Sequence, residues 1–212
     1  GIGRIPVQTL EEANQFVDKV LSYDSNPNSS FFNPSSGGDW KNKICFVADD
    51  VDAAWEINLV NHADALAEKI DTTYNYFNLK KIYTDSYQQS LLGGSQRYPE
   101  AQEDLVNLIN DGVFIVNYVG HGGEVGWASE RILELSDINN FTNINRLPVF
   151  ITATCEFTRY DDPTRISAGE YLVLNPNGGA IGLYSTSRTV AEAPTYYLVD
   201  ALYTYLPDKN LN

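Results

Sequence analysis

The sequence predicts an α/β fold in which helices cover both faces of a mostly parallel sheet. Short apolar segments alternate along the chain with segments whose apolar residues recur at helical spacing. This alternation is typical of parallel strands joined by helical crossovers, which gives three α/β/α layers. The strand segments are apolar without interruption, as expected for strands buried on both faces. With 212 residues, the chain fits one large domain, residues 1–212.

The first element is a predicted helix that runs from a capping Thr9 through Tyr23. Its first turn carries two glutamates, which the positive end of a helix favours. Residues 24–39 are rich in Asn, Ser, Pro and Gly, and they predict a polar loop. Residues 1–6 contain no initiator methionine, and we expect the chain to be an excerpt from a longer protein.

Strands and helices alternate after this loop. The segments predicted as strands are Lys43–Ala48, Lys80–Tyr83, Val113–Val119, Val149–Ala153 and Ala180–Tyr184. The segments predicted as helices are Trp55–Tyr76, Gln96–Leu108, Ser167–Leu174 and Pro194–Leu206. Parallel strands end at the same edge of a sheet, and ligands bind at that edge in such folds. Polar residues that follow these strands are therefore candidates for function.

Composition excludes two classes of partner. The formal net charge is −14, whereas binding to nucleic acid or to an anionic membrane surface needs clustered Lys and Arg. No segment predicts a transmembrane helix. The sequence contains neither an Asp-rich calcium loop nor Cys and His residues at zinc spacing. We therefore expect no metal and no cofactor, with structural calcium as an alternative that no motif supports.

Two reactive side chains follow two of the predicted strands. His121 lies among Gly120, Gly122 and Gly123 after the third strand, and Cys155 follows the fourth. A thiol nucleophile needs a base within reach, and an imidazole can serve as that base. Backbone N–H groups of the glycines can also point at an oxyanion. The pair predicts a catalytic dyad, against the alternatives of an incidental histidine in a tight turn and a structural cysteine.

Other polar residues are weaker candidates. Asp49 or Glu124 could orient the imidazole, and both could equally be solvated loop carboxylates. Cys45 lies within an apolar segment and predicts a small buried hydrophobe. His62, inside the long helix, predicts a surface or boundary residue. The pair Asp161-Asp162 could bind a basic substrate side chain, although a loop or N-capping role is the preferred interpretation.

Several of these motifs resemble one group of enzymes. An apolar strand followed by His-Gly, then a second apolar strand followed by Ala-x-Cys, resembles the clan of caspases, legumains and gingipains. Within it, Gly120–Glu124 with Trp127, and the opening Gly3–Val7, resemble the gingipain family. Further stretches are similar to the PorU-type sortase of the type IX secretion system: Glu130–Leu133, Thr152–Phe157 and Asn175–Ala180.

The resemblance covers nearly the whole chain and implies a caspase-like fold. It implies that Cys155 is the nucleophile and that His121 is the general base and acid. The N–H groups of Gly122 and Cys155 would form the oxyanion hole. The resemblance also implies that five residues line the substrate groove: Trp127, Ser185, Thr186, Ser187 and Arg188. In this family a further segment precedes the position of Gly1, so part of the first subdomain is expected to be missing.

The resemblance also implies a function at the exterior of a bacterial outer membrane. The sortase branch cleaves C-terminal signal domains from exported cargo and passes the acyl group to water or to an amine. Exported cargo and other secretion-system components are therefore the expected partners. The alternatives are a general gingipain-like protease, a non-catalytic binding or scaffold module of the same fold, and a hydrolase of non-peptide acyl substrates.

Overall fold

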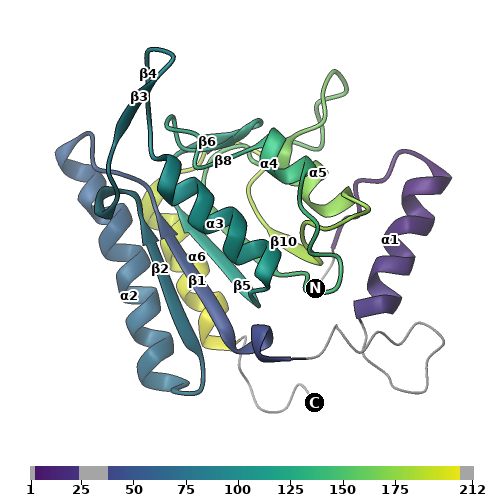
Figure 1. The fold of residues 1–212 in the computed structure, drawn as a ribbon, viewed down its shortest axis with the longest axis horizontal. Coiled ribbons are helices and arrows are strands. Elements are labelled where there is room, and N and C mark those ends of the chain that lie inside the picture. Colours follow the sequence, from purple (N-terminus) through teal and green to yellow (C-terminus); the bar gives the residue numbers. More distant parts are fainter. Residues whose placement is uncertain (1–2, 24–37, 206–212) are drawn as a thin grey trace.

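Five parallel strands form the central sheet of the computed structural model, which describes residues 3–23 and 38–205 (Figure 1). In spatial order the strands are β10 (Gly182–Tyr184), β9 (Val149–Ala153), β5 (Ile115–Val119), β1 (Lys43–Ala48) and β2 (Asn78–Tyr83). All four neighbouring pairs are parallel, which confirms the predicted parallel sheet. The predicted loop at residues 24–39 lies almost entirely outside the described residues.

The register of the three central strands brings their ends level. Val119 at the end of β5 pairs with Ala153 at the end of β9 and with Ala48 at the end of β1. His121 lies two residues after Val119, and Cys155 lies two residues after its partner Ala153, so both residues leave the sheet at the same level. Asp49 directly follows Ala48, which pairs with Val119, so His121, Cys155 and Asp49 all lie at the same edge of the sheet.

Helices cover both faces of the sheet. On one face, α2 (Ile57–Thr73) and α6 (Glu192–Tyr205) bury their apolar residues against Ile44, Phe46 and Ala48 of β1. On the other face, α3 (Pro99–Asp111), α4 (Leu135–Asn139) and α5 (Ala168–Leu174) pack with the alternate β1 residues Cys45 and Val47. The predicted three-layer arrangement is confirmed. None of the described helices is long and apolar enough to cross a membrane.

Helix α1 (Leu10–Tyr23) packs at the α5 side of the molecule. Thr9 Oγ1 accepts the Glu12 N–H at 3.1 Å, and the Glu12 carboxylate accepts the Thr9 N–H in return at 3.2 Å. Lys19 is buried, and its ammonium donates to the carbonyls of Val173 at 2.8 Å and Gly178 at 2.9 Å. Burial lowers the pKa of Lys19 to about 8.

Two parts of the chain differ from the sequence prediction. A hairpin of β3 (Ser90–Leu92) and β4 (Ser95–Arg97) occupies the start of the helix predicted from Gln96. Its turn uses Gly93 and Gly94, both with positive φ, and α3 begins only at Pro99. A small antiparallel sheet of β6 (Gly122–Gly123), β7 (Gly126–Trp127) and β8 (Leu133–Glu134) follows His121.

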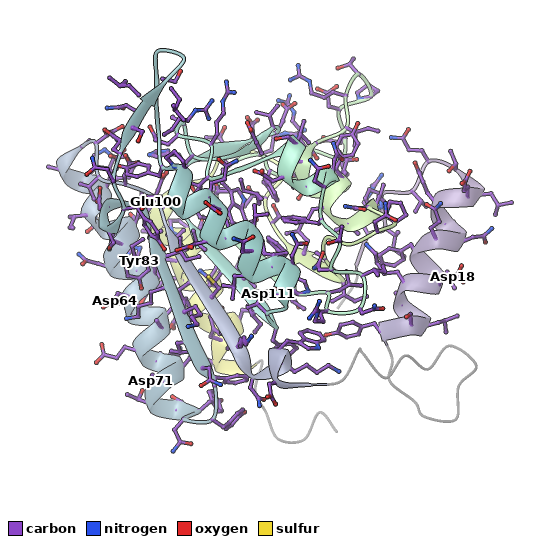
Figure 2. All side chains as sticks on the ribbon, in the orientation of Figure 1. Asp18, Asp64, Asp71, Tyr83, Glu100 and Asp111 are labelled. Atoms are coloured by element: carbon purple, nitrogen blue, oxygen red, sulfur yellow. The ribbon has the colours of Figure 1, made fainter. Side chains whose placement is uncertain are left out.

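The outer faces of the helices carry exposed carboxylates. Figure 2 labels Asp18 on α1, Asp71 on α2 and Glu100 on α3, all of which are exposed. The negative charge is therefore distributed over separate helices.

Candidate active site

The backbone of His121 is fixed by two residues from neighbouring strands. Its N–H donates to Asp49 Oδ2 at 2.7 Å, and its carbonyl accepts the Tyr118 hydroxyl at 2.5 Å. Gly120 makes this arrangement possible, because a Cβ there would lie 2.4 Å from the Tyr118 oxygen and 2.6 Å from the Asp49 Cβ. Burial raises the pKa of Asp49 to about 7, although the bond from His121 acts in the opposite direction.

The imidazole of His121 contacts a buried carboxylate. Its Nε2 lies 3.0 Å from Glu56 Oε1, and the second Glu56 oxygen accepts the Ala53 N–H at 2.6 Å. The Trp55 ring meets the imidazole edge-on at a centroid distance of 5.7 Å. With Nε2 bonded to Glu56, Nδ1 is the ring nitrogen available to a thiol.

Glu56 is suited to stay ionised at this position. Burial alone would raise its pKa, but hydrogen bonds from the Ala53 backbone and from His121 outweigh that effect and hold the pKa below its ordinary value. An ionised carboxylate bonded to one ring nitrogen fixes the orientation of an imidazole and stabilises its protonated form. Glu56 is thus placed as an orienting residue.

Cys155 lies beyond the end of β9 and is partly exposed. Its sulfur accepts the Val190 N–H at 3.5 Å and lies 3.8 Å from the Val190 carbonyl oxygen. Cys45 differs, because it is fully buried within β1 and burial strongly raises its pKa. The structure therefore contains one accessible thiol at the carboxyl edge of the sheet and one enclosed thiol in the core.

A single cavity of about 370 Å³ has both His121 and Cys155 in its wall. The rest of the lining is mainly apolar and includes Trp55, Leu59, Val119, Ala153, Val190 and Tyr196. His121 also lines a larger cavity of about 790 Å³, which extends along the small sheet and is lined by residues such as Gly123 and Glu134. His121 thus contributes to the walls of two cavities.

The two carboxylates expected to orient the imidazole have other contacts. Asp49 bonds the His121 backbone rather than the ring. Glu124 pairs with Arg159 at 2.8 Å and with Arg165 at 3.0 Å. Among the described residues, the carboxylate bonded to the ring is Glu56. Sequence reasoning missed it, although a glutamate at the start of the helix that follows β1 is the signal that could have found it.

The segment Ser185–Arg188 runs beside the residues that follow Cys155. The Thr186 hydroxyl donates to the Thr154 carbonyl, and the Thr186 carbonyl accepts the Thr158 N–H at 3.1 Å. Ser185 and Ser187 line a separate cavity of about 550 Å³. The segment thus flanks the site, while Thr189 and Val190 directly after it line the cavity that holds the thiol.

Arg188 and its neighbours form a local ion pair. The guanidinium of Arg188 binds both carboxylate oxygens of Asp161, which lowers the pKa of Asp161 to about 2. Asp162 accepts the N–H and hydroxyl of Thr164. These contacts give the aspartate pair the loop role that the sequence interpretation preferred.

Trp127 and His62 have contacts in the protein interior or at its boundary. The Trp127 ring is fully buried and stacks on Tyr118 at a centroid distance of 4.3 Å. The His62 Nδ1 lies 2.6 Å from Glu192, and its ring stacks on Tyr196. The indole therefore supports the strand that leads to His121.

Gly122, expected to help bind an oxyanion, packs against the strand end that carries Cys155. A Cβ at Gly122 would lie 2.5 Å from Thr154 Oγ1 and 3.0 Å from the Gly126 carbonyl oxygen. The absent side chain thus lets the two loops approach each other closely.

The sheet and its flanking helices have the architecture of the caspase-like α/β class of cysteine peptidases. The sequence profile of peptidase family C25 matches residues 1–212, and the chain belongs to that family. Gingipain R2 from Porphyromonas gingivalis is 21% identical over 157 residues, which cover 73% of this chain and 18% of that protein. Gingipain R1 from the same organism is 21% identical over 157 residues, with 73% and 14% coverage.

Solved structures agree with the family at the level of the fold. The Arg-specific cysteine proteinase gingipain R superposes with a TM-score of 0.69 and 19% identity, over 92% of this chain and 41% of that chain. The complex of Porphyromonas gingivalis RgpB pro- and mature domains gives a TM-score of 0.75 and 19% identity, with 100% and 46% coverage. The chain thus spans less than a fifth of the curated relatives' length and less than half of these structures.

Proposed function

We propose that this chain is the catalytic part of a cysteine endopeptidase that forms an acyl-thioenzyme on Cys155. The observation that carries the proposal is the shared cavity, which has the partly exposed thiol and the Glu56-bound imidazole in one wall. Membership of peptidase family C25 supports the same reaction class.

In this proposal each residue has a separate role in the reaction. His121 Nδ1 takes the proton of the thiol, and Sγ attacks the carbonyl carbon of the scissile peptide bond. The N–H groups of Gly122 and Cys155 would hold the resulting oxyanion. His121 then gives its proton to the departing amine, which leaves an acyl-thioester on Cys155. Glu56 keeps the imidazole oriented and stabilises it while it is protonated.

The acyl-thioester allows either of two acceptors, and we propose the sortase reaction. On the resemblance to the PorU-type branch, the substrate is exported cargo with a C-terminal signal domain, and the acceptor is an amine or water. The enzyme would then act at the bacterial cell surface, alongside other secretion-system components. A general gingipain-like protease is the second candidate, which the similarity to gingipains R1 and R2 favours.

Thiol labelling tests the peptidase proposal directly. An acyl electrophile that reacts with thiols should modify Cys155 faster than Cys45 in the folded protein, and His121→Ala should slow that reaction. Equal labelling of the two cysteines would contradict catalysis and favour a non-catalytic module.

Cargo processing separates sortase from general protease. In the full-length protein, Cys155→Ala should stop removal of the signal domain, and an added amine nucleophile should appear at the new carboxyl terminus of processed cargo. Normal processing by Cys155→Ala would contradict the sortase role, and hydrolysis without amine incorporation would favour the general protease.

A further inference from the structure

The two backbone N–H groups proposed to hold the oxyanion come from different loops. Gly122 belongs to the histidine loop, residues 120–125 after β5, and Cys155 belongs to the cysteine loop, residues 154–159 after β9. Donors stabilise an oxyanion only when they keep a fixed geometry relative to each other. A contact that joins the two loops therefore serves the reaction without touching the substrate.

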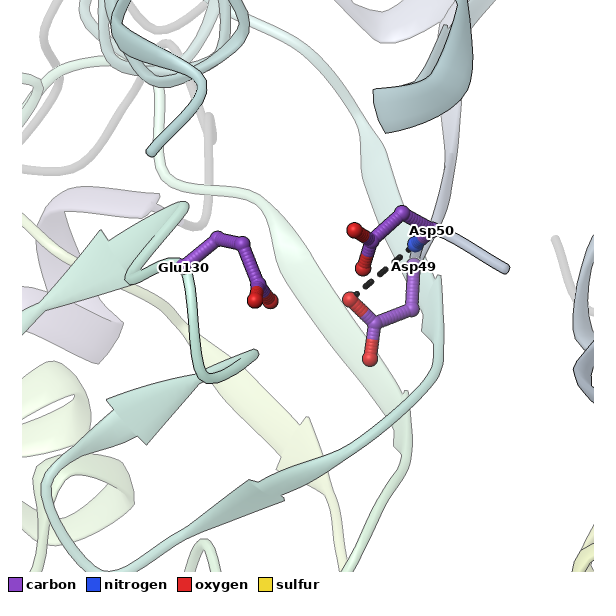
Figure 3. Close-up of side chains that lie close together, drawn as sticks. All are labelled: Asp49, Asp50 and Glu130. Atoms are coloured by element: carbon purple, nitrogen blue, oxygen red, sulfur yellow. Dashed lines mark hydrogen bonds between the residues drawn. The ribbon is translucent and has the colours of Figure 1, made fainter. Parts of the chain in front are cut away.

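The start of the histidine loop is fixed by Asp49. One carboxylate oxygen of Asp49 accepts the His121 N–H at 2.7 Å, and the other accepts the Asp50 N–H at 3.2 Å. Figure 3 shows these two aspartates beside Glu130, and the three residues form a buried carboxylate cluster. This anchor acts on His121, so the residues that follow it in the loop need a contact of their own.

Arg159 makes a contact between the two loops. Its Nη1 donates to Glu124 Oε1 at 2.8 Å and to Glu156 Oε1 at 3.3 Å. Glu124 lies two residues after Gly122, and Glu156 directly follows Cys155. One guanidinium nitrogen therefore connects the near neighbours of both proposed oxyanion donors.

This bridge is partly shielded from water. The exposed fraction of the side chain is 11% for Glu124, 30% for Glu156 and 35% for Arg159. Shielded ion pairs with hydrogen bonds are stronger than pairs at a fully exposed surface. Arg165 also reaches Glu124, with Nη1 3.0 Å from Oε2, but its side chain is 59% exposed and its other ion pair is with Asp162. Of the two arginines, Arg159 is the one that links both loops.

The backbone of Glu156 is a second and independent observation. Its φ is +52°, and among the described residues other than glycine only Ala128 and Arg131 also have a positive φ. Such strain persists only where surrounding contacts hold it. The Glu156 N–H donates to the Arg188 carbonyl at 3.3 Å, and its carboxylate accepts the bond from Arg159. These contacts hold the strained turn that directly follows the proposed nucleophile.

We propose that Arg159 is a positioning residue that holds the N–H groups of Gly122 and Cys155 at the spacing that an oxyanion requires. It acts through Glu124 and Glu156 rather than on the substrate. This inference rests on the proposed peptidase function. Because an oxyanion forms only on the way to the acyl-thioester, loss of Arg159 should lower kcat and leave KM nearly unchanged.

Two assays on the full-length protein test this role. On a fluorogenic peptide selected by wild-type turnover, Arg159→Gln should lower kcat at least tenfold, and Arg159→Lys, which keeps the charge, should recover part of the loss. In the second assay, iodoacetamide alkylates Cys155 as the sulfur displaces iodide, and no oxyanion forms. The rate and pH profile of alkylation should therefore match the wild type in both variants, and Cys45 should stay unlabelled if the variants are folded.

Arg165→Gln is the matched control, because it removes a cation from Glu124 but keeps the bridge, and it should retain most of the wild-type kcat. Wild-type kcat in Arg159→Gln, or an equal loss in Arg165→Gln, would overturn the positioning role. Slower alkylation or a shifted pH profile in Arg159→Gln would also overturn it, since the guanidinium would then act on the thiol. A wild type without peptidase activity would overturn the proposed function itself, and this inference with it.

Discussion

At the scale of single residues, His121 is held at three atoms, one in its ring and two in its backbone. Glu56 bonds its ring, Asp49 bonds its backbone N–H and Tyr118 bonds its carbonyl. Each contact acts on a different atom of the same residue. Substitutions at these positions should therefore separate the orientation of the ring from the placement of the loop.

Replacement of Glu56 by Gln should lower kcat by about 10- to 1000-fold and leave KM nearly unchanged. The amide keeps the shape but lacks the charge that stabilises the protonated ring. Peptide or cargo hydrolysis under steady-state conditions provides the measurement. The exposed Glu68→Gln on α2 is the matched control, and a Glu56→Gln enzyme with wild-type kcat would rule out the orienting role.

The same substitution predicts a pH dependence of stability. The pKa of Glu56 in the folded protein lies below its ordinary value of 4.5, so the carboxylate stabilises the fold above that pH. This contribution is lost as the pH falls through the folded-state pKa. Urea unfolding should show a gap between wild type and Glu56→Gln that is constant above about pH 5 and shrinks below about pH 4.5. A gap of equal size at both ends of this range would contradict the argument.

Gly120→Ala should destabilise the fold by about 1–3 kcal/mol and reduce activity. Its new Cβ would lie 2.4 Å from the Tyr118 oxygen, so that either the hydroxyl or the histidine loop must move. Gly182→Ala, whose Cβ meets nothing within 4 Å, should stay close to the wild type. Denaturant unfolding of both variants checks the comparison, and equal losses would show that local crowding is not the cause.

At the scale of elements, α1 is held to the body of the protein by a buried amine. The Lys19 ammonium bonds three carbonyls, those of Val173, Gly178 and Ala180, at the end of α5 and in the turn beyond it. The helix is otherwise amphipathic, with Leu10 and Val17 exposed. Lys19 is therefore the polar contact that ties α1 to the residues at the end of α5.

Lys19→Met should lower the free energy of unfolding by about 1–3 kcal/mol, because it leaves buried carbonyls without a donor. Lys80→Met, at an exposed position on β2, is the control and should change little. Hydrogen exchange should show faster opening of α1 in Lys19→Met. If the slowest-exchanging amides of α1 are unaffected, the amine does not hold the helix.

Elements with strong periodicity could be predicted from the sequence, and short irregular ones could not. Lys43–Ala48 and Val149–Ala153 have the predicted bounds because uninterrupted apolar runs are specific for buried parallel strands. The helix at Trp55–Tyr76 begins later, at Ile57, because a 3-10 turn at Ala54–Glu56 precedes it. The strands β6 to β8 have two residues each, which is too short for any alternation to appear.

The residues of the candidate site also differ in how far the sequence predicts them. His121 and Cys155 were predictable because each ends a strand, and parallel strands share an edge. Glu56 was only weakly predictable: its place at the start of the helix after β1 is a signal, but only tertiary packing decides that its carboxylate reaches the imidazole. Glu130 was not predictable, since it belongs to an irregular segment whose direction only tertiary packing decides. The carboxylate cluster joins residues that have no pattern in common along the sequence.

At the scale of the whole molecule, the formal net charge is −14, and exposed carboxylates such as Asp18, Asp71 and Glu100 lie on three separate helices (Figure 2). Repulsion between like charges lowers the stability of the folded state, and dissolved salt screens this repulsion. Urea unfolding should therefore show greater stability in 500 mM than in 20 mM monovalent salt, and NaCl and KCl should act alike. A fall in stability with salt would mean that the surface ion pairs outweigh the repulsion.

The order of the strands along the chain also affects the order in which the site can assemble during folding. The chain reaches β1, then β2, β5, β9 and β10, and each later strand docks on an edge that already exists. On the proposed function, a chain that folds as it emerges from the ribosome would bring His121 to Glu56 when β5 docks, before Cys155 has been synthesised. Pairing of distant strands is slow, so the docking of β9, which brings Cys155 to the same edge as His121, would come later. A copy that ends before β9 would therefore carry the proposed base without the proposed nucleophile.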